Sequence, residues 1–273
     1  MMIETVLIFL GVFCIAFAFA PAGLGGGMLF VPLLHYVAGL PIDGTLLAIS
    51  LSLTAVVSYG SGLAHRKKGY HDDKAIKSAL FGAVPGALLG VGIVILLGEN
   101  LDSVFKMISV AILVWALIKT RKKILTGEVN EEAEKVERSF PIKHLHLRLG
   151  AASGGILSSV LAIGAGVVYV PVLQQSAGLS ARKSIGSSLH LMMIVVPIAV
   201  VTHLIFISTV ERDALVDQIG MIFGLTILTF VGARMGAQFG MRYISSENIM
   251  KIFMGLATVV LIRYLWDLGG LIG

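Results

Sequence analysis

Long apolar runs separated by short polar stretches make up most of the chain. Ten runs can be distinguished, at 3–20, 27–38, 44–64, 77–97, 102–118, 147–163, 166–178, 184–208, 216–240 and 248–266. Most contain roughly 17–25 residues, the length that an α-helix needs to cross a bilayer. The second and seventh runs are shorter and do not reach across upright. The pattern predicts an all-α integral membrane protein with either ten full spans or six spans and two re-entrant hairpins.

A glycine-rich stretch followed by one proline occurs twice. GLGGGMLFVPLL begins at Gly23 and AIGAGVVYVPVL begins at Ala162, so that Pro32 and Pro171 lie 139 residues apart, close to half the chain. An internal duplication in a strongly apolar protein is typical of a carrier built from two related halves with a binding site between them.

Five apolar runs precede a long polar stretch and five follow it. Because an odd number of spans reverses the direction of the second half, we expect inverted repeats. The predicted parts are an N-terminal transmembrane repeat at 1–118, a charged cytoplasmic linker at 119–146 with a helix in its middle, and a C-terminal transmembrane repeat at 147–273.

Composition and charge support a membrane protein and give its orientation. The chain is 56% hydrophobic and 14% charged, with a mean hydropathy of +0.92, so lipid is the expected solvent. Of 21 Lys and Arg residues, 16 lie in 65–77, 119–148, the Arg182–Lys183 turn and Arg242, which alternation puts on one side. The positive-inside rule makes that side cytoplasmic and both termini external, in the cell membrane. The net charge of +5 therefore reflects membrane-flanking loops and not nucleic-acid binding.

No pattern in the chain indicates enzyme chemistry. Cys14 is the single cysteine, which excludes a disulfide framework and a cysteine metal site. Neither a nucleotide-binding motif nor a metal-ligand cluster is present, so no cofactor is expected. The run 3–20 is interpreted as a membrane segment and not a cleaved signal peptide, because Glu4 stands where a basic region is expected.

The two glycine-rich turns are the strongest candidates for a binding site. Small residues there permit tight turns and close approach of a ligand, and each turn precedes a helix whose first amides carry partial positive charge. That arrangement suits an anion. The residues are Gly25, Gly26 and Gly27 in the first turn and Gly164, Ala165 and Gly166 in the second. The alternative is that these small residues only allow two helices to pack closely.

Hydroxyl side chains follow each turn at equivalent positions, because Ala48–Leu51 matches Gly186–Leu189. Ser50 and Ser188 are favoured as donors to an oxyanion over Ser52, Thr54 and Ser187. The alternative for each is a hydrogen bond to a carbonyl one helical turn back.

A later glycine ladder is also duplicated, at Gly82, Gly86 and Gly90 and at Gly232, Gly236 and Gly240. Small residues at every fourth position form a groove for a neighbouring helix, so a packing role is expected. The second ladder contains Arg234. A charge within a span faces either a cavity or the interface, which leaves anion contact, gating and snorkelling open for Arg234.

Polar residues within apolar runs add candidates for the binding site and for proton coupling. His190 follows Ser188 closely, and His35 and Gln174 each lie three residues after the motif proline of their half. A histidine titrates near neutral pH, so His35 or His190 is a candidate for coupling substrate to protons. The alternative is a structural hydrogen bond to a neighbouring helix.

These motifs together resemble the TauE/SafE family of sulfite-exporter-like permeases, also called TSUP, over roughly residues 5–265. The resemblance rests on the duplicated glycine–proline motif, the small-Ser-Leu stretch and the late glycine ladder. It implies an inner-membrane permease for sulfur-containing anions such as sulfite or sulfonates. Ala165 departs from the family pattern, which has glycine at the middle of the turn.

The sequence thus predicts a secondary transporter for a small sulfur-containing oxyanion that works by alternating access. A passive anion channel of the same fold is the alternative. The expected partners are the anion and the lipid bilayer, not nucleic acid. Proton coupling and assembly into a homo-oligomer remain open.

Overall fold

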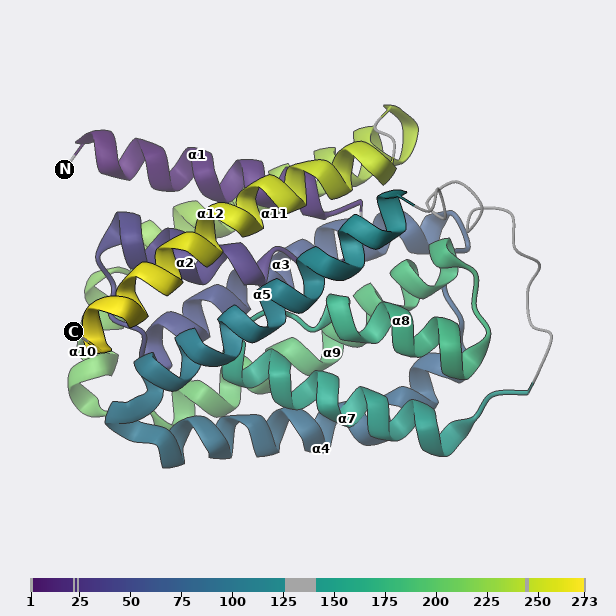
Figure 1. Ribbon diagram of the computed structural model, residues 1–273, viewed down its shortest axis with the longest axis horizontal. Coiled ribbons are helices and arrows are strands. Elements are labelled where there is room, and N and C mark those ends of the chain that lie inside the picture. The colour runs from purple at the N-terminus through teal and green to yellow at the C-terminus, as the bar shows by residue number, and fades with distance from the viewer. Residues whose placement is uncertain (1, 22, 24, 126–140, 244–245, 273) are drawn as a thin grey trace.

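The structure is a computed structural model that describes residues 2–21, 23, 25–125, 141–243 and 246–272 (Figure 1). Helices form from nearly every apolar run. They are α1 (Met2–Phe19), α2 (Gly27–Ala38), α3 (Gly44–Lys67), α4 (Asp73–Leu97), the 3-10 turn η1 (Gly98–Asn100), α5 (Leu101–Leu125), α7 (His144–Leu161), α8 (Gly166–Ala177), α9 (Ala181–Phe206), α10 (Thr209–Asp217), α11 (Ile219–Tyr243) and α12 (Ser246–Ile272). The helix expected in the middle of the linker falls in 126–140, outside the described residues.

The predicted all-α membrane class is confirmed. Five helical stretches in the described chain are long and apolar enough to cross a bilayer: Gly44–Lys67, Asp73–Lys122, Ala181–Phe206, Ile219–Phe239 and Met250–Gly270. The second of these joins α4 and α5 through η1. Large apolar side chains such as Leu96 and Trp266 are 87% and 75% exposed on the outer surface, as expected where lipid is the solvent.

One helix departs from the sequence prediction. Residues 209–217 fold as α10, although they were expected to form part of a polar loop. A reciprocal pair of hydrogen bonds stabilises its start: the amide of Glu211 donates to Ser208 Oγ, and the amide of Ser208 donates to Glu211 Oε2. Capping chemistry, and not hydrophobic periodicity, explains why this short helix forms.

The glycine-rich turns are the tips of two hairpins. In Figure 1, α1 runs from the left end of the molecule toward the middle and α2 returns to the left, whereas α7 and α8 do the same from the right end. Helices α2 and α8 contain 12 residues each, about 18 Å at 1.5 Å per residue, too short to cross upright. This geometry agrees with six spans and two hairpins and not with ten spans.

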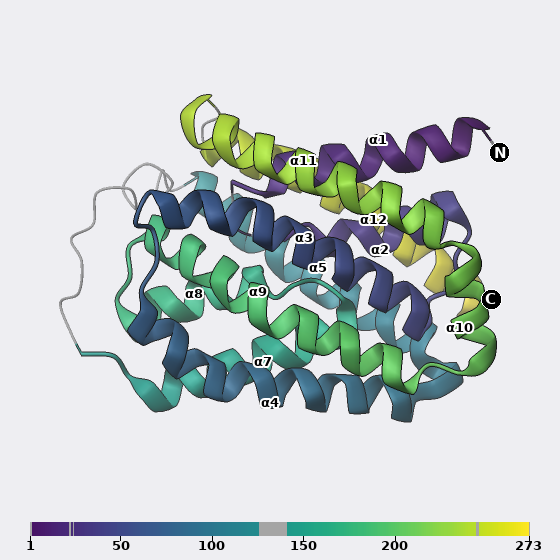
Figure 2. The ribbon, with the colours of Figure 1, turned by 180° about the vertical axis from the view of Figure 1, so that it is seen from behind.

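Helices α3 and α9 pack against each other at the centre. Helix α11 packs on the other side of α3, and α4 on the other side of α9, an order that Figure 2 shows from top to bottom as α11, α3, α9 and α4. The hairpins then pack on the flanks, α1 against α11 and α7 against α4, and α5 packs against α12. The contacts between the halves come in corresponding pairs: α1 with α11 corresponds to α7 with α4, and α3 with α11 corresponds to α9 with α4.

The glycine ladders make the flanking contacts possible. A Cβ atom at Gly82 or Gly86 of α4 would overlap the carbonyls of Arg148 and Ala152 in α7, and one at Gly236 of α11 would overlap the carbonyl of Phe17 in α1. The predicted packing role is therefore confirmed for these positions. The surroundings of Gly240 lie outside the described part of the chain.

A buried ion cluster ties three helices together at the end of the molecule where both termini lie. Lys106 of α5 is 5% exposed, and its Nζ lies 3.0 Å from Asp102 Oδ2 and 3.2 Å from Asp267 Oδ2 of α12. The Tyr36 hydroxyl of α2 donates to Asp267 Oδ2 over 2.8 Å. These partners explain how a lysine is accommodated inside an apolar run.

Candidate functional site

Both glycine-rich turns adopt left-handed backbone conformations. The φ angles are +74° at Gly25, +75° at Gly26, +69° at Gly164 and +54° at Ala165. Gly26 and Ala165 are the residues that cap the N-termini of α2 and α8. An alanine in this region costs roughly 1 kcal/mol relative to glycine, so the second turn keeps the same path at an energetic disadvantage.

The two turns touch each other at the centre of the protein. A Cβ atom at Gly27 would overlap the carbonyl oxygen of Ala162 and would lie 2.8 Å from Ile163 Cα. Gly27 is therefore required for close backbone contact between the hairpins. Gly25, Gly26, Gly27, Gly164, Ala165 and Gly166 are all buried.

Two side chains from the central helices lie against both turns. A Cβ atom at Gly25 would lie 3.0 Å from Thr54 Cγ2 of α3 and 3.4 Å from Met192 Sδ of α9. A Cβ atom at Gly164 would meet the same Thr54 methyl group and lie 3.1 Å from the same Met192 sulfur. Thr54 and Met192 therefore lie between the tips of the hairpins.

The first amides of α2 and α8 lie beside this contact. The first helical hydrogen bonds run from Leu29 N to Gly26 O over 3.0 Å and from Val168 N to Ala165 O over 2.9 Å. The amides that precede Leu29 and Val168 in each helix have no carbonyl within their own helix, and the N-cap residues Gly26 and Ala165 form no side-chain capping bond. Two partial positive charges thus face the middle of the membrane protein from opposite halves.

Buried hydroxyl groups of α3 contact the turns, and Ser188 of α9 lies one helical turn before Met192. Ser50, Thr54 and Ser188 are each 0% exposed. Ser50 Oγ donates to the Ala162 carbonyl over a long 3.5 Å, whereas Thr54 Oγ1 and Ser188 Oγ have no partner in the described part of the chain. An unpaired buried hydroxyl costs about 1–3 kcal/mol, so these two groups are donors available to a ligand or water.

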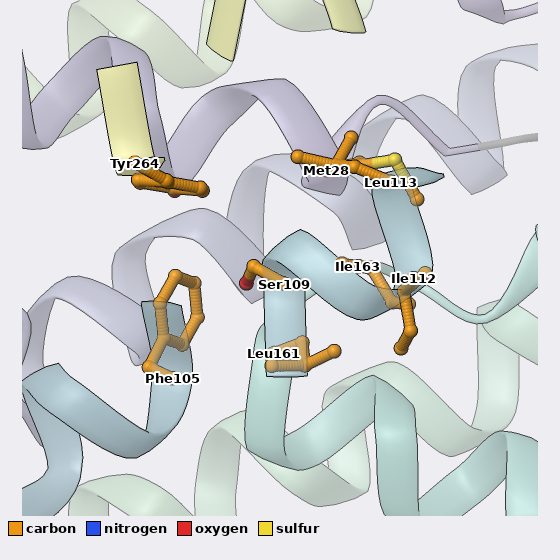
Figure 3. Close-up of a pocket in the computed structure, with 8 residues that line it drawn as sticks. All are labelled: Met28, Phe105, Ser109, Ile112, Leu113, Leu161, Ile163 and Tyr264. Atoms are coloured by element: carbon orange, nitrogen blue, oxygen red, sulfur yellow. The ribbon is translucent and has the colours of Figure 1, made fainter. Parts of the chain in front are cut away.

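A small cavity borders the turns (Figure 3). Met28 of α2, Leu161 of α7 and Ile163 of the second turn point toward it, and Tyr264 and Ser109 supply its polar groups. The cavity volume open to the centre of a water-sized sphere is about 10 Å³, room for about one water molecule. This cavity is too small for an oxyanion.

Two other predicted site residues face the connection between α3 and α4. Ser187 Oγ accepts a hydrogen bond from the amide of Asp72 over 3.0 Å. His190 Nδ1 lies 2.7 Å from the Gly186 carbonyl, and its ring stacks on His71. The structure therefore places Ser187 and His190 on α9 with Ser188, but in contact with the loop and not with the turns.

The remaining predicted residues lie farther from the turns along their helices. His35 comes eight residues after Gly27, about 12 Å along α2, and its Nδ1 lies 2.7 Å from the Leu40 carbonyl. Gln174 occupies the corresponding place in α8. Arg234 is half-buried, and its backbone lies against Gly60 of α3, about 9 Å along that helix from Thr54.

Thr54 and Met192 are the residues that sequence reasoning undervalued. Each lies four residues after the favoured serine of its half, Ser50 or Ser188, and so on the same helix face. The 138-residue spacing that relates the serines also relates Thr54 to Met192. This register was the signal that could have identified them.

Comparison with known proteins agrees with this architecture. The model of the family described as "Sulfite exporter TauE/SafE" matches residues 8–264. The chain belongs to the TauE/SafE family. It is 28% identical over 256 residues, 92% of this chain and 90% of the relative, to a "Probable membrane transporter protein" of Xylella fastidiosa (strain 9a5c). A protein of the same name from strain Temecula1 / ATCC 700964 is 26% identical over 252 residues, with the same coverage. No solved structure matches.

The chain is a multi-pass membrane transporter, and a small anion is the substrate that the family implies.

Proposed function

We propose that the protein is a secondary carrier that moves a small sulfur-containing oxyanion, such as sulfite or an organosulfonate, across the cytoplasmic membrane by alternating access. The observation that carries this proposal is the meeting of two helix N-termini at the centre of the fold, beside the unpaired hydroxyl of Thr54 and one helical turn from that of Ser188. Helix N-termini and hydroxyls stabilise an anion without a fixed counter-charge.

The binding site is formed by both turns and by the central helices. Its backbone part consists of Gly25, Gly26, Gly27, Gly164, Ala165 and Gly166. Its side-chain part consists of Thr54, Ser50 and Ser188, with Met192 as the apolar wall. Ser187 and His190 contact the α3–α4 loop and Arg234 lies against Gly60, so we assign all three a role away from the bound anion.

Alternating access follows from the closed contact between the turns. Gly27 packs directly on the Ala162 carbonyl, and the adjacent cavity holds about one water molecule. An oxyanion enters only when the hairpins separate. A channel needs a continuous open path, so the contact favours a carrier over the passive channel.

The two halves act as inverted repeats, with 1–118 and 147–273 related by a pseudo-two-fold axis in the membrane plane. This is supported by the exchange of partners in the fold, since α1 packs on α11 as α7 packs on α4. The hairpins also point inward from opposite ends (Figure 1).

The end that carries the α3–α4 loop and the ends of the linker is cytoplasmic, and both termini are external. This orientation is supported by the gathering of basic residues at one end of the molecule and of the two termini at the other (Figure 1).

Counterflow in proteoliposomes tests the proposed function. Vesicles loaded with unlabelled sulfite are expected to accumulate external labelled sulfite transiently, and uptake is expected to saturate with concentration. Methanesulfonate, sulfate and acetate added as competitors define the substrate class. Flux that rises linearly without counterflow would assign a channel, and no flux of any sulfur anion would refute the proposal.

A further inference from the structure

The loop between α3 and α4, residues 68–72, is held against the first half of α9. The amide of Asp72 donates to Ser187 Oγ, and Arg182 Nη1 donates to the Tyr70 hydroxyl over 3.3 Å. The Tyr70 carbonyl lies so close to Gly186 that a Cβ atom there would overlap it. These contacts fix the position of the following residue, His71, beside α9.

His71 and His190 stack on each other at this contact. Their ring centroids are 5.3 Å apart and the rings are inclined by 21°. His190 is 8% exposed, whereas the His71 side chain is 22% exposed. The pair therefore links a buried position on α9 with the water at the loop end of the molecule.

The hydrogen bonds of the pair determine where the protons lie in its neutral form. His190 Nδ1 faces the Gly186 carbonyl, which only accepts, so Nδ1 carries the hydrogen and Nε2 carries the lone pair. His71 Nε2 lies 3.9 Å from the Asp73 carboxylate, too far for a hydrogen bond, but this negative charge favours the hydrogen on Nε2 and the lone pair on Nδ1. Both His190 Nε2 and His71 Nδ1 are buried and have no partner among the described residues.

Two buried lone pairs on stacked rings lack a donor between them. A single added proton supplies that donor: it binds one nitrogen, and the other nitrogen accepts from it through a bridging water. A second proton would place two positive charges about 5 Å apart, which the pair resists. The arrangement is suited to hold one proton.

Charged groups from each neighbouring element face this position. Arg66 of α3 disfavours a positive charge on His190, and Asp73 of α4 favours it. His65 of α3 is the third imidazole nearby. Asp73, 3.9 Å from His71 Nε2, is therefore the acidic group that supports a proton on the pair.

We propose that His71 and His190 together bind the proton that is coupled to anion movement. The inference rests on the proposed carrier function. Ser188 and His190 are two residues apart on α9, so the anion site and the proton site share one helix. A proton from the aqueous phase reaches His71 first and is shared with His190, where its charge balances that of the anion.

Histidine NMR tests the proton site without any transport assay. The protein labelled at imidazole carbon in lipid nanodiscs is titrated from pH 5 to pH 9, and seven single His→Gln variants assign the seven histidines. We expect the resonances of His71 and His190 to titrate together, and His71→Gln to move the midpoint of His190 by about one pH unit. His203→Gln is the matched control, since His203 is also a buried histidine of α9, bonded to the Ser159 carbonyl.

Two results would overturn the proton site. One is a His190 resonance that does not titrate, or whose titration midpoint is unchanged in His71→Gln. The other is a stoichiometric, chelator-reversible shift of both resonances by Zn²⁺ at neutral pH, which would assign a metal site.

A flux measurement tests the coupling. Proteoliposomes that contain a pH-sensitive dye receive an inward gradient of methanesulfonate, whose own charge does not change across this pH range. We expect protons to move with the anion in the wild type. The rate of proton movement is expected to fall at least about tenfold in His190→Gln and to change by no more than about twofold in His203→Gln. Anion flux without proton movement would refute the coupling but not the carrier. Absence of flux for both methanesulfonate and sulfite would refute the carrier, and the NMR titration would then decide the proton site by itself.

Discussion

The two hairpin tips follow the same backbone path with different residues. The first turn reaches its left-handed conformations with glycines, and the second does so at Ala162 and Ala165, with φ angles of +52° and +54°. The central helices differ in the same way, because Thr54 of α3 offers a hydroxyl group where Met192 of α9 offers a thioether. The comparison teaches that a duplicated fold preserves the contact between the halves while the chemistry presented to a ligand diverges. At this pair of equivalent positions the first half offers a polar group and the second half an apolar one.

The largest expected effect comes from breaking the contact between the tips. Gly27→Ala forces a Cβ atom onto the Ala162 carbonyl, so we expect at least about a hundredfold loss of sulfite flux with normal insertion in the membrane. Gly92→Ala is the matched control, because a Cβ atom at Gly92 of α4 meets no atom within 4 Å. Radiolabelled uptake, normalised to the amount of protein in the vesicles, measures both variants. Normal uptake by Gly27→Ala would show that the tips separate freely.

A smaller effect is expected from making the two halves chemically alike. Thr54→Val keeps the shape of the side chain but removes the hydroxyl, and we expect the Kd for sulfite to rise about tenfold, since a hydrogen bond to a charged group contributes about 1.5 kcal/mol or more. Met192→Leu keeps the apolar wall, so a change within about twofold is expected. Isothermal titration in detergent measures both. Equal losses in the two variants would contradict the division of roles between the halves.

The paired serines give a finer comparison. Ser188 Oγ has no partner in the described chain, whereas Ser50 Oγ donates to the Ala162 carbonyl. Ser188→Ala is therefore expected to weaken sulfite binding about fivefold without lowering the melting temperature. Ser50→Ala is expected to lower the melting temperature slightly and to change binding less. Thermal unfolding with and without sulfite separates the two roles, and the reverse ranking would return Ser188 to a structural role.

The smallest effect is expected at the starts of the central helices. Asp43 caps α3, since its Oδ1 accepts from the Leu46 amide over 2.9 Å, whereas the Ser180 side chain makes no capping bond to α9. Asp43→Ala is expected to cost about 1 kcal/mol of stability, and Ser180→Ala close to none. Denaturation in mild detergent measures the difference. A similar cost for both would mean that the cap at Asp43 contributes nothing.

Much of the fold was predictable because lipid leaves few choices to the backbone. Apolar runs of bilayer length must be helices, and the runs of 12 and 13 residues that contain Pro32 and Pro171 were too short to cross upright. The glycine ladders predicted close helix packing, and Gly82 and Gly236 show it. Helix α10 was not predicted, because its start depends on the Ser208–Glu211 cap and not on periodicity.

The candidate site was less predictable because it depends on contacts between distant segments. The sequence identified the glycine turns and Ser188 but could not show that Thr54 lies against both turns. Counting from the prolines identified His35 and Gln174 as equivalent polar positions of the two halves, and helix rise places each about 12 Å along its helix from the turn. The pairing of His190 with His71 requires the α3–α4 loop to fold back onto α9, and no local pattern reveals such an arrangement.

Main-chain atoms, and not variable side chains, close the middle of this protein where Gly27 meets Ala162. In a carrier of the proposed kind, leak-tightness and cargo choice are therefore assigned to separate parts of the molecule. Substitutions at residues 54 and 192 are then expected to retune which solute is accepted while the barrier to ions stays intact. A single added methyl group at residue 27, by contrast, reaches the barrier itself.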